Sequence, residues 1–135
     1  MALQFSVAVR NARADATESV VGTSAVMRIF TGSPPANCAA ADSGTLLAEL
    51  TLPSDWMNAA SSGSKTKNGT WQDASANNSG TAGHFRIYDS GATTCHHQGT
   101  CSASGGGGDM ILNTTTLTAG QSFTVNTYTI NEANA

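Results

Sequence analysis

Residues 84–89 read His-Phe-Arg-Ile-Tyr-Asp, and this stretch decides the fold class. Phe85 and Ile87 alternate with polar or amphipathic side chains, which is the period of a β-strand with two different faces. A Ser-Gly dipeptide at positions 90–91 favours a tight turn into a second strand over residues 93–100. We therefore expect an antiparallel hairpin in this part of the chain.

Further β-favouring runs lie on both sides of this hairpin, at residues 25–31, 45–52, 109–113 and 122–131. Asn68-Gly69 is a strong signal for a type I′ hairpin turn, and the small polar residues 73–83 predict a long surface loop. Because the strands are short and no βαβ spacing occurs, we expect a mainly β fold, an antiparallel β-sandwich or jelly-roll-like domain over residues 23–135. The predicted core is Val26, Ile29, Leu46, Leu50, Trp56, Trp71, Phe85, Ile87, Ile111, Phe123 and Val125.

Residues 1–22 predict a helical arm in front of that domain. One face of the helix carries apolar residues spaced by three or four positions, namely Phe5, Val9, Ala12, Ala16 and Val20. The opposite face carries Arg10, Asn11, Asp15 and Glu18. Gly22 suits a left-handed C-cap. Because the apolar stripe is narrow and rich in alanine, we expect that the domain or a neighbouring subunit must hold the helix.

The composition excludes several function classes. Only 11% of the 135 residues are charged and the formal net charge is -3, so a sequence-independent grip on DNA or on an acidic membrane is not expected. No apolar run approaches the roughly 20 residues that span a bilayer. The first residues also lack the basic and apolar regions of a signal peptide. We expect no direct contact with nucleic acid or membrane.

The chain has three cysteines, an odd number, so at least one thiol stays free or pairs between chains. A disulfide would join Cys38 to either Cys95 or Cys101, provided that the protein matures outside a reducing cytosol. We retain Cys38 and Cys95 as the candidate pair.

The segment from Cys95 to Cys101 holds the densest cluster of reactive side chains. The six-residue gap between these cysteines is not the spacing of a zinc knuckle, and the adjacent His96 and His97 would point to opposite faces of a strand. Cys95 and His97 would share a face, but no Asp or Asn stands beside them to orient the imidazole. We expect no enzyme, no metal and no cofactor. A small hydrolase acting through Cys95 and His97 is the alternative.

Several longer strings carry a resemblance that no single motif provides. They are Ala8–Ala16 (Ala-Val-Arg-Asn-Ala-Arg-Ala-Asp-Ala), Arg28–Gly44, Leu52–Met57, Gly69–Asp73, Gly80–Tyr88 and Gly105–Met110. Together they make nearly the whole chain similar to small structural proteins of tailed bacteriophages and prophages. The resemblance implies a virion component and supplies no catalytic residues.

Among virion roles, the size and composition favour a capsid decoration (cement) protein. Such a protein would bind the major capsid protein on the outer shell, favour a homotrimer, and stabilise the shell against the pressure of packaged DNA. It would be made in the bacterial host cytoplasm and reside on the capsid surface. We expect the N-terminal helix to act as the docking arm, through Phe5, Val9, Arg10 and Arg13.

Two other functions stay open. A tail or head–tail connector protein would also be rich in β-structure, but it would assemble into rings or tubes. A carbohydrate-binding or host-adhesion module would use an exposed Trp56 or Trp71 to stack on sugar, although burial in the core is the usual fate of such residues.

Overall fold

The alternating stretch forms β5 (Gly80–Tyr88), the strand around which the sheet is built in the computed structural model, which describes residues 3–133. On one side β5 pairs with β1 (Val26–Thr31), and β2 (Leu46–Thr51) continues the sheet beyond β1. On the other side it pairs with β6 (Cys95–Ser102). All three pairings are antiparallel. The expected hairpin between β5 and β6 is therefore confirmed.

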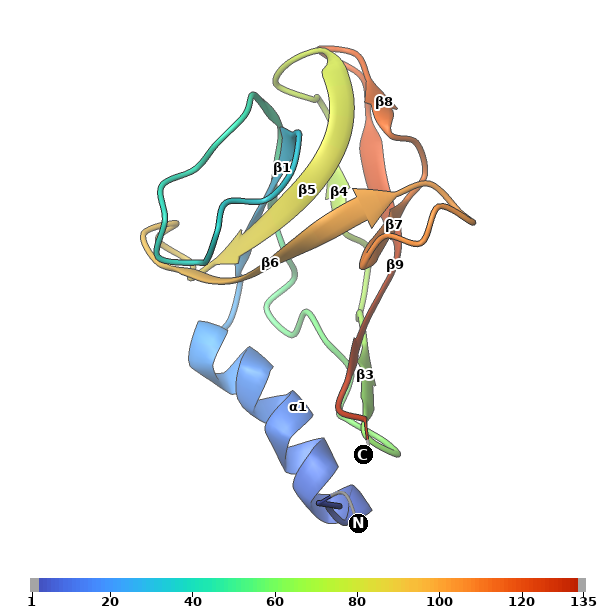
Figure 1. The fold of residues 1–135 in the computed structure, drawn as a ribbon. Helices are drawn as coiled ribbons and strands as arrows, with labels where there is room; N and C mark the ends of the chain where they lie inside the picture. Colours follow the sequence, from blue (N-terminus) through green and yellow to red (C-terminus); the bar gives the residue numbers. More distant parts are fainter. Residues whose placement is uncertain (1–2, 134–135) are drawn as a thin grey trace.

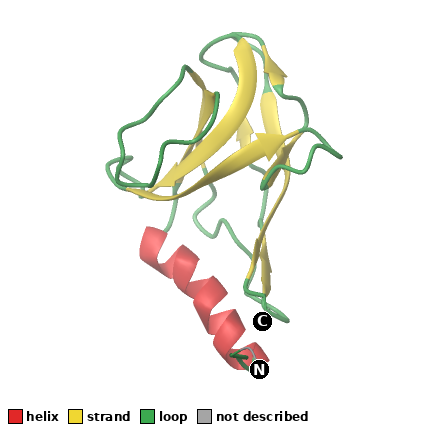
Figure 2. Cartoon of the chain, in the orientation of Figure 1, coloured by secondary structure: helices red, strands yellow, loops and turns green. Residues whose placement is uncertain are grey.

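The sheet continues from β6 through one parallel pairing. β7 (Met110–Leu112) runs parallel to β6, and β9 (Phe123–Asn131) runs antiparallel to β7. Both β3 (Ser64–Thr66) and β4 (Gln72–Asp73) pair with β9, and β8 (Thr116–Leu117) pairs with the start of β5. The strand order is β2-β1-β5-β6-β7-β9-β3 (Figures 1 and 2).

This sheet is open but strongly curled, so its two ends approach each other. The backbone N–H of Glu49 in β2 donates to the Asp73 carboxylate of β4 at 3.2 Å. Just after β4, the N–H of Asn77 donates to the Leu47 carbonyl at 2.8 Å. The loop after β4 therefore covers the outer edge of β2, which would otherwise present unpaired backbone groups. The mainly β prediction is confirmed.

The core lies inside the curl and agrees closely with the predicted set. Nine of its eleven residues are buried, and Leu46 and Ile111 are half-buried. Trp56 and Trp71 are both 0% exposed, with ring centroids 6.0 Å apart. Tyr128 also belongs to this core, since its ring packs on Trp71. A register shift in β9 places Val125 and Tyr128 on the same face, which strict alternation does not predict.

Two local expectations were wrong. The turn expected at Asn68-Gly69 does not join a hairpin, because the strands on either side of it pair with β9 and not with each other. The loop expected over residues 73–83 ends at Gly80, where β5 begins. A Cβ atom at Gly83 would lie 2.2 Å from the Gly32 carbonyl oxygen, so this strand uses glycine to let another backbone pass closely.

The expected helix forms as α1 (Val7–Val21), beneath the sheet and beside β3 (Figure 1). Ser6 caps its N-terminus, and Gly22 follows its last turn with φ +89°. Residues 1–2 of the predicted arm and 134–135 of the predicted domain lie outside the described range. Within residues 3–133, no helix has the length and apolar character needed to cross a membrane.

Candidate docking surface

Helix α1 is joined to the domain through its polar face. Asn11, Asp15 and Glu18 follow one another at spacings of four and three, so they lie on one side of the helix. Their side-chain oxygens accept hydrogen bonds from three backbone N–H groups in the segment after β2: Gly63 at 2.7 Å, Ala60 at 2.9 Å and Met57 at 3.2 Å. This polar row docks the helix together with Ala14 and Val21, the two buried apolar residues of α1.

Lys65 of β3, the strand beside the helix, completes this contact. Its side chain is 2% exposed, and its Nζ lies 2.8 Å from both the Asp15 and the Glu18 carboxylates. It also donates to the Asn58 carbonyl at 2.9 Å. A buried ammonium group requires such partners, because an unpaired one is very costly. We call Asn11, Asp15, Glu18 and Lys65 the polar latch.

Asp15 and Lys65 of the polar latch keep their charges over a wide pH range. The hydrogen bond from Lys65 holds the pKa of Asp15 below its ordinary value of 3.8. Burial alone would lower the pKa of Lys65, but the hydrogen bonds to Asp15 and Glu18 outweigh it and raise the pKa above 10.5. The stability from Asp15 is therefore present above about pH 4 and is lost as the pH falls through its lowered pKa. The stability from Lys65 is lost only as the pH rises through its raised pKa.

The apolar face of α1 points away from the domain. We call its residues, all exposed, the outer stripe: Phe5, Val9, Ala12, Ala16 and Val20. Every large hydrophobic side chain that is exposed within residues 3–133 belongs to this segment: Leu3 (73%), Phe5 (37%), Val7 (47%), Val9 (42%) and Val20 (69%). Such concentration of apolar surface typically marks an interaction site.

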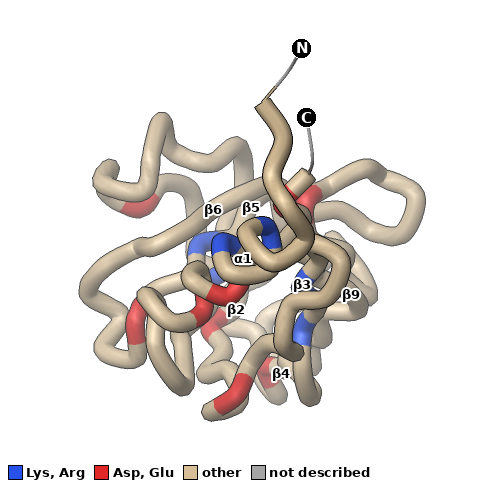
Figure 3. The backbone as a smooth tube through the Cα atoms, turned by 90° about the horizontal axis from the view of Figure 1, so that it is seen from below, with Lys and Arg blue, Asp and Glu red and all other residues tan. Residues whose placement is uncertain are grey.

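The four residues expected in the docking arm do not share one side of the helix. Phe5 and Val9 lie on the outer stripe, and Arg13 lies over the Phe5 ring at 5.1 Å while it pairs with Glu132 at 3.3 Å. Arg10 faces the domain, where its Nη1 donates to the Glu132 carbonyl at 3.4 Å. Figure 3 shows blue and red segments together where α1 crosses the domain. The structure thus brings Phe5, Val9 and Arg13 to an outward surface and gives Arg10 a contact with the C-terminal segment.

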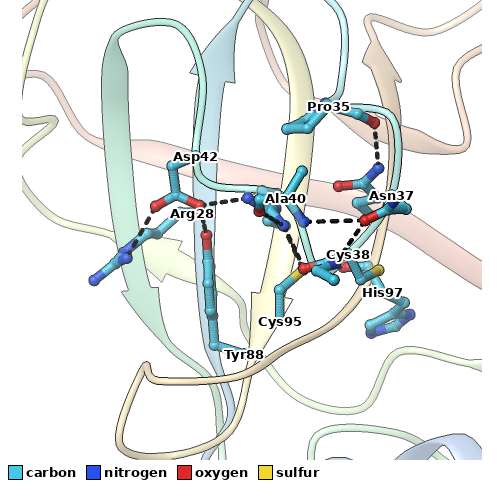
Figure 4. Close-up of polar contacts among 12 residues, drawn as sticks. Arg28, Pro35, Asn37, Cys38, Ala40, Asp42, Tyr88, Cys95 and His97 are labelled. Carbon is cyan, nitrogen blue, oxygen red and sulfur yellow. Dashed lines mark hydrogen bonds and ion pairs between the residues drawn. The ribbon is translucent and has the colours of Figure 1, made fainter.

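The candidate disulfide residues lie together on the other face of the sheet, around Arg86 (Figure 4). Arg86 is 1% exposed, and its guanidinium donates to the carbonyls of Cys38 and Ala40 at 2.8 and 2.9 Å. The same guanidinium donates to Asp42 at 2.7 Å and to the Cys95 Sγ at 3.3 Å. One side chain of β5 thereby holds the loop of residues 32–44 against the sheet.

Asp42 gathers two further side chains at this place. The Tyr88 hydroxyl donates to the Asp42 carboxylate, and Arg28 pairs with the same carboxylate at 3.3 Å. Burial, together with the hydrogen bond to Asp42, raises the pKa of Tyr88. The Tyr88 hydroxyl therefore stays protonated and anchors the loop, and all of these groups satisfy one another.

Cys95 and His97 do not form the nucleophilic pair that the sequence left open. A register shift between β5 and β6 pairs Tyr88 with Cys95 and Ile87 with His97, which puts the two side chains on opposite faces. His97 is half-buried and packs against the core, with its Nδ1 3.1 Å from the Tyr128 hydroxyl. The expectation that Cys95 and His97 share a face was wrong. Within the described part of the chain, no three His, Cys, Asp or Glu side chains are placed to hold one metal ion.

Trp56 and Trp71, the residues considered for sugar binding, are completely buried. Each indole N–H donates to a backbone carbonyl, from Trp56 to Gly22 at 2.9 Å and from Trp71 to Asn68 at 3.1 Å. Neither ring is available to stack on a sugar at the surface, so the structure offers no support for carbohydrate binding through these two residues.

Sequence reasoning missed the residues that organise both places. It assigned Asn11, Asp15 and Glu18 to the polar face of the helix. No sequence pattern around Lys65 predicted that this residue would be buried against them. It also missed Arg86, because two of its partners are backbone carbonyls, which leave no residue-type signal. Comparisons of the chain with family models, curated proteins and solved structures gave no match.

Proposed function

We propose that this protein is a structural component of a tailed-phage virion, and specifically a capsid decoration protein. In this proposal the outer stripe of α1 docks on the major capsid protein at the shell surface. The observation that supports it most is that the exposed large hydrophobic residues among positions 3–133 all lie between Leu3 and Val20. We infer the partner, the major capsid protein, from the resemblance of the sequence to small phage structural proteins.

The polar latch gives this docking surface a defined position before it binds. Because the opposite side of α1 is bonded to the domain, the outer stripe needs little ordering when a partner covers it. Covering on the order of 300 Å² of apolar surface would contribute about 7 kcal/mol before the costs of association. Many copies on one shell would multiply this contribution, and self-association, with a trimer favoured, would add avidity.

The β-domain would serve as the rigid body of the decoration protein. We propose that the curled sheet is a sandwich or jelly-roll-like domain. The approach of β4 to β2 and the covering of both faces of β5 support this description.

The test is co-sedimentation with shells of the encoding phage from which this protein has been stripped. We expect saturation at hundreds of copies, near a simple multiple of the number of capsomers. The double variant Val9→Lys and Val20→Lys should bind at least about tenfold more weakly, because charge on the outer stripe must be desolvated on docking. Thr81→Lys, an exposed position at the start of β5, is the matched control and should bind like the wild type.

Two results would count against the proposal. Equal binding of the stripe variant and the wild type would remove the outer stripe from the interface. Failure to bind shells, with recovery of about six or twelve copies per intact particle, would move the protein to a tail or connector ring.

A further inference from the structure

The geometry points to a disulfide between Cys38 and Cys95, formed by exchange with a small disulfide such as oxidised glutathione, that locks the loop of residues 32–44 onto the sheet. The inference concerns a modification site inside the chain and does not depend on the proposed virion role. It rests on the contact between the two cysteines, their shared opening to solvent and the contrast with Cys101.

The two thiols are already side by side in the reduced protein. The Cys38 side chain is close enough to the Cys95 thiol to influence it electrostatically. Figure 4 shows the two residues near each other, between the loop and the sheet. Arg86 fixes both residues at once, through the Cys38 carbonyl at 2.8 Å and the Cys95 Sγ at 3.3 Å. Arg86 thereby keeps the two residues in one place, and separation is the usual obstacle to a disulfide between distant parts of a chain.

The pair is open to a small reagent. Cys38 and Cys95 are both half-buried, and both line a surface cavity of about 280 Å³ together with Asp42, Arg86 and Tyr88. Burial raises the pKa of the Cys95 thiol, while the hydrogen bond from Arg86 acts in the opposite direction. The guanidinium is therefore placed to stabilise the thiolate that must form during exchange.

Cys101 provides an internal contrast. It is buried in the core, and burial raises the pKa of its thiol to about 12. A neutral thiol without access to solvent is a poor partner in exchange. Cys38 and Cys95 thus form one half-buried pair of thiols, and Cys101 is the buried thiol left over from the odd number of cysteines.

The exchange proceeds in two balanced steps. The Cys38 thiolate attacks one sulfur of oxidised glutathione, forms a mixed disulfide and releases one glutathione thiolate. The Cys95 thiolate then attacks the Cys38 sulfur, which forms the intramolecular bond and releases the second glutathione. The two cysteine protons end on the two glutathione molecules, and the two electrons lost by the cysteines reduce the glutathione disulfide.

The bond would close a long loop and should stabilise the fold. Joining residues so distant in sequence restricts the unfolded chain, and for a domain of this size we expect Tm to rise by about 5–10 °C. The rise should appear in the oxidised wild type and disappear after reduction.

The test treats folded, full-length protein with oxidised glutathione, blocks the remaining thiols and maps tryptic peptides by mass spectrometry. Cleavage after Arg28, Lys65 and Arg86 places Cys38 in residues 29–65 but leaves Cys95 and Cys101 together in 87–135. Variants must therefore separate the two candidate partners.

Cys101→Ala should still give the cross-linked peptide pair, with one glutathione-free disulfide per chain. Cys38→Ser and Cys95→Ser should give no cross-link, and the remaining exposed thiol should carry glutathione instead. The inference is overturned if the wild type keeps three alkylatable thiols under conditions that glutathionylate Cys38→Ser or Cys95→Ser, or if the cross-link survives Cys95→Ser and disappears in Cys101→Ala.

Discussion

At the scale of single residues, His97 is the group beside the core whose shifted pKa matters in mild acid. Burial lowers the pKa of His97 to about 4, from an ordinary value of 6.5, and the charge of His96 acts in the same direction. The His97 ring packs against Trp56, Phe85 and Tyr128, so the folded protein keeps it neutral. This one imidazole therefore makes the fold sensitive to mild acid.

We predict that the free energy of unfolding falls by about 3 kcal/mol between pH 6.5 and pH 4 because of His97. The unfolded chain takes up the proton near pH 6.5, whereas the folded chain resists it until about pH 4. Stability from the neutral ring is thus complete above pH 6.5 and is lost as the pH falls. Urea titrations across this range should show a much smaller pH slope for His97→Gln. His96→Gln should keep most of the slope, and equal slopes in all three proteins would refute the assignment.

At the scale of elements, the polar latch explains how a helix with an exposed apolar face stays in place. Its carboxylates balance the buried ammonium group of Lys65, and the Gly22 carbonyl at the end of α1 accepts the Trp56 indole N–H. Removal of residues 3–22 would take away both counter-charges of Lys65 and the carbonyl that accepts the Trp56 indole N–H, and it would open this side of the domain to solvent. The helix is therefore part of the domain's own stability, and point variants of the outer stripe test docking better than its deletion.

We predict that the double variant Asp15→Asn and Glu18→Gln loses about 3 kcal/mol of unfolding free energy, because Lys65 then stays buried without a counter-charge. Adding Lys65→Met should restore most of this loss, since an apolar side chain needs no partner. Glu49→Gln, which breaks the exposed pair with Arg28, is the control and should cost no more than about 1 kcal/mol. Chemical denaturation measures all three, and a triple variant no more stable than the double one would contradict this account.

The close approach of β5 to the Gly32 backbone predicts how a substitution at Gly83 changes stability. Gly83→Ala should destabilise the fold by about 2 kcal/mol or more, because its Cβ would lie 2.2 Å from the Gly32 carbonyl oxygen. Gly91→Ala is the matched control, since its Cβ would meet its nearest neighbour at an ordinary 3.6 Å. A thermal shift that is the same for both variants would show that the backbones can separate without cost.

At the scale of the whole molecule, the periodicity of the sequence predicted the main helix and strands. Long-range contacts, which leave no periodic pattern in the sequence, determine how these elements pack together. Alternation identified β5 and its hairpin with β6, and helical spacing identified α1. Alternation could not show that both faces of β5 are covered. The loop of residues 32–44 is held there by backbone carbonyls and by one buried arginine, Arg86.

The docking surface of α1 was also predicted only in part from sequence periodicity. The sequence placed the apolar residues of α1 on one face and the polar residues on the other, and the structure keeps both sets. Which face meets the domain depends on Lys65, a single residue far along the chain whose burial no local pattern signals. The pairing of β3 and β4 with β9, in place of a hairpin at Asn68-Gly69, is likewise a long-range choice that a turn signal does not determine.

The described part of the chain begins and ends at the same end of the molecule, beside α1 and β3, while β8 lies at the opposite end (Figure 1). A reporter or antigen fused to either terminus would therefore emerge next to the outer stripe, where it would compete with any partner for space. The exposed turn of residues 118–121, next to β8, faces the other way. Cargo inserted at that turn would be displayed outward and leave the docking helix unobstructed.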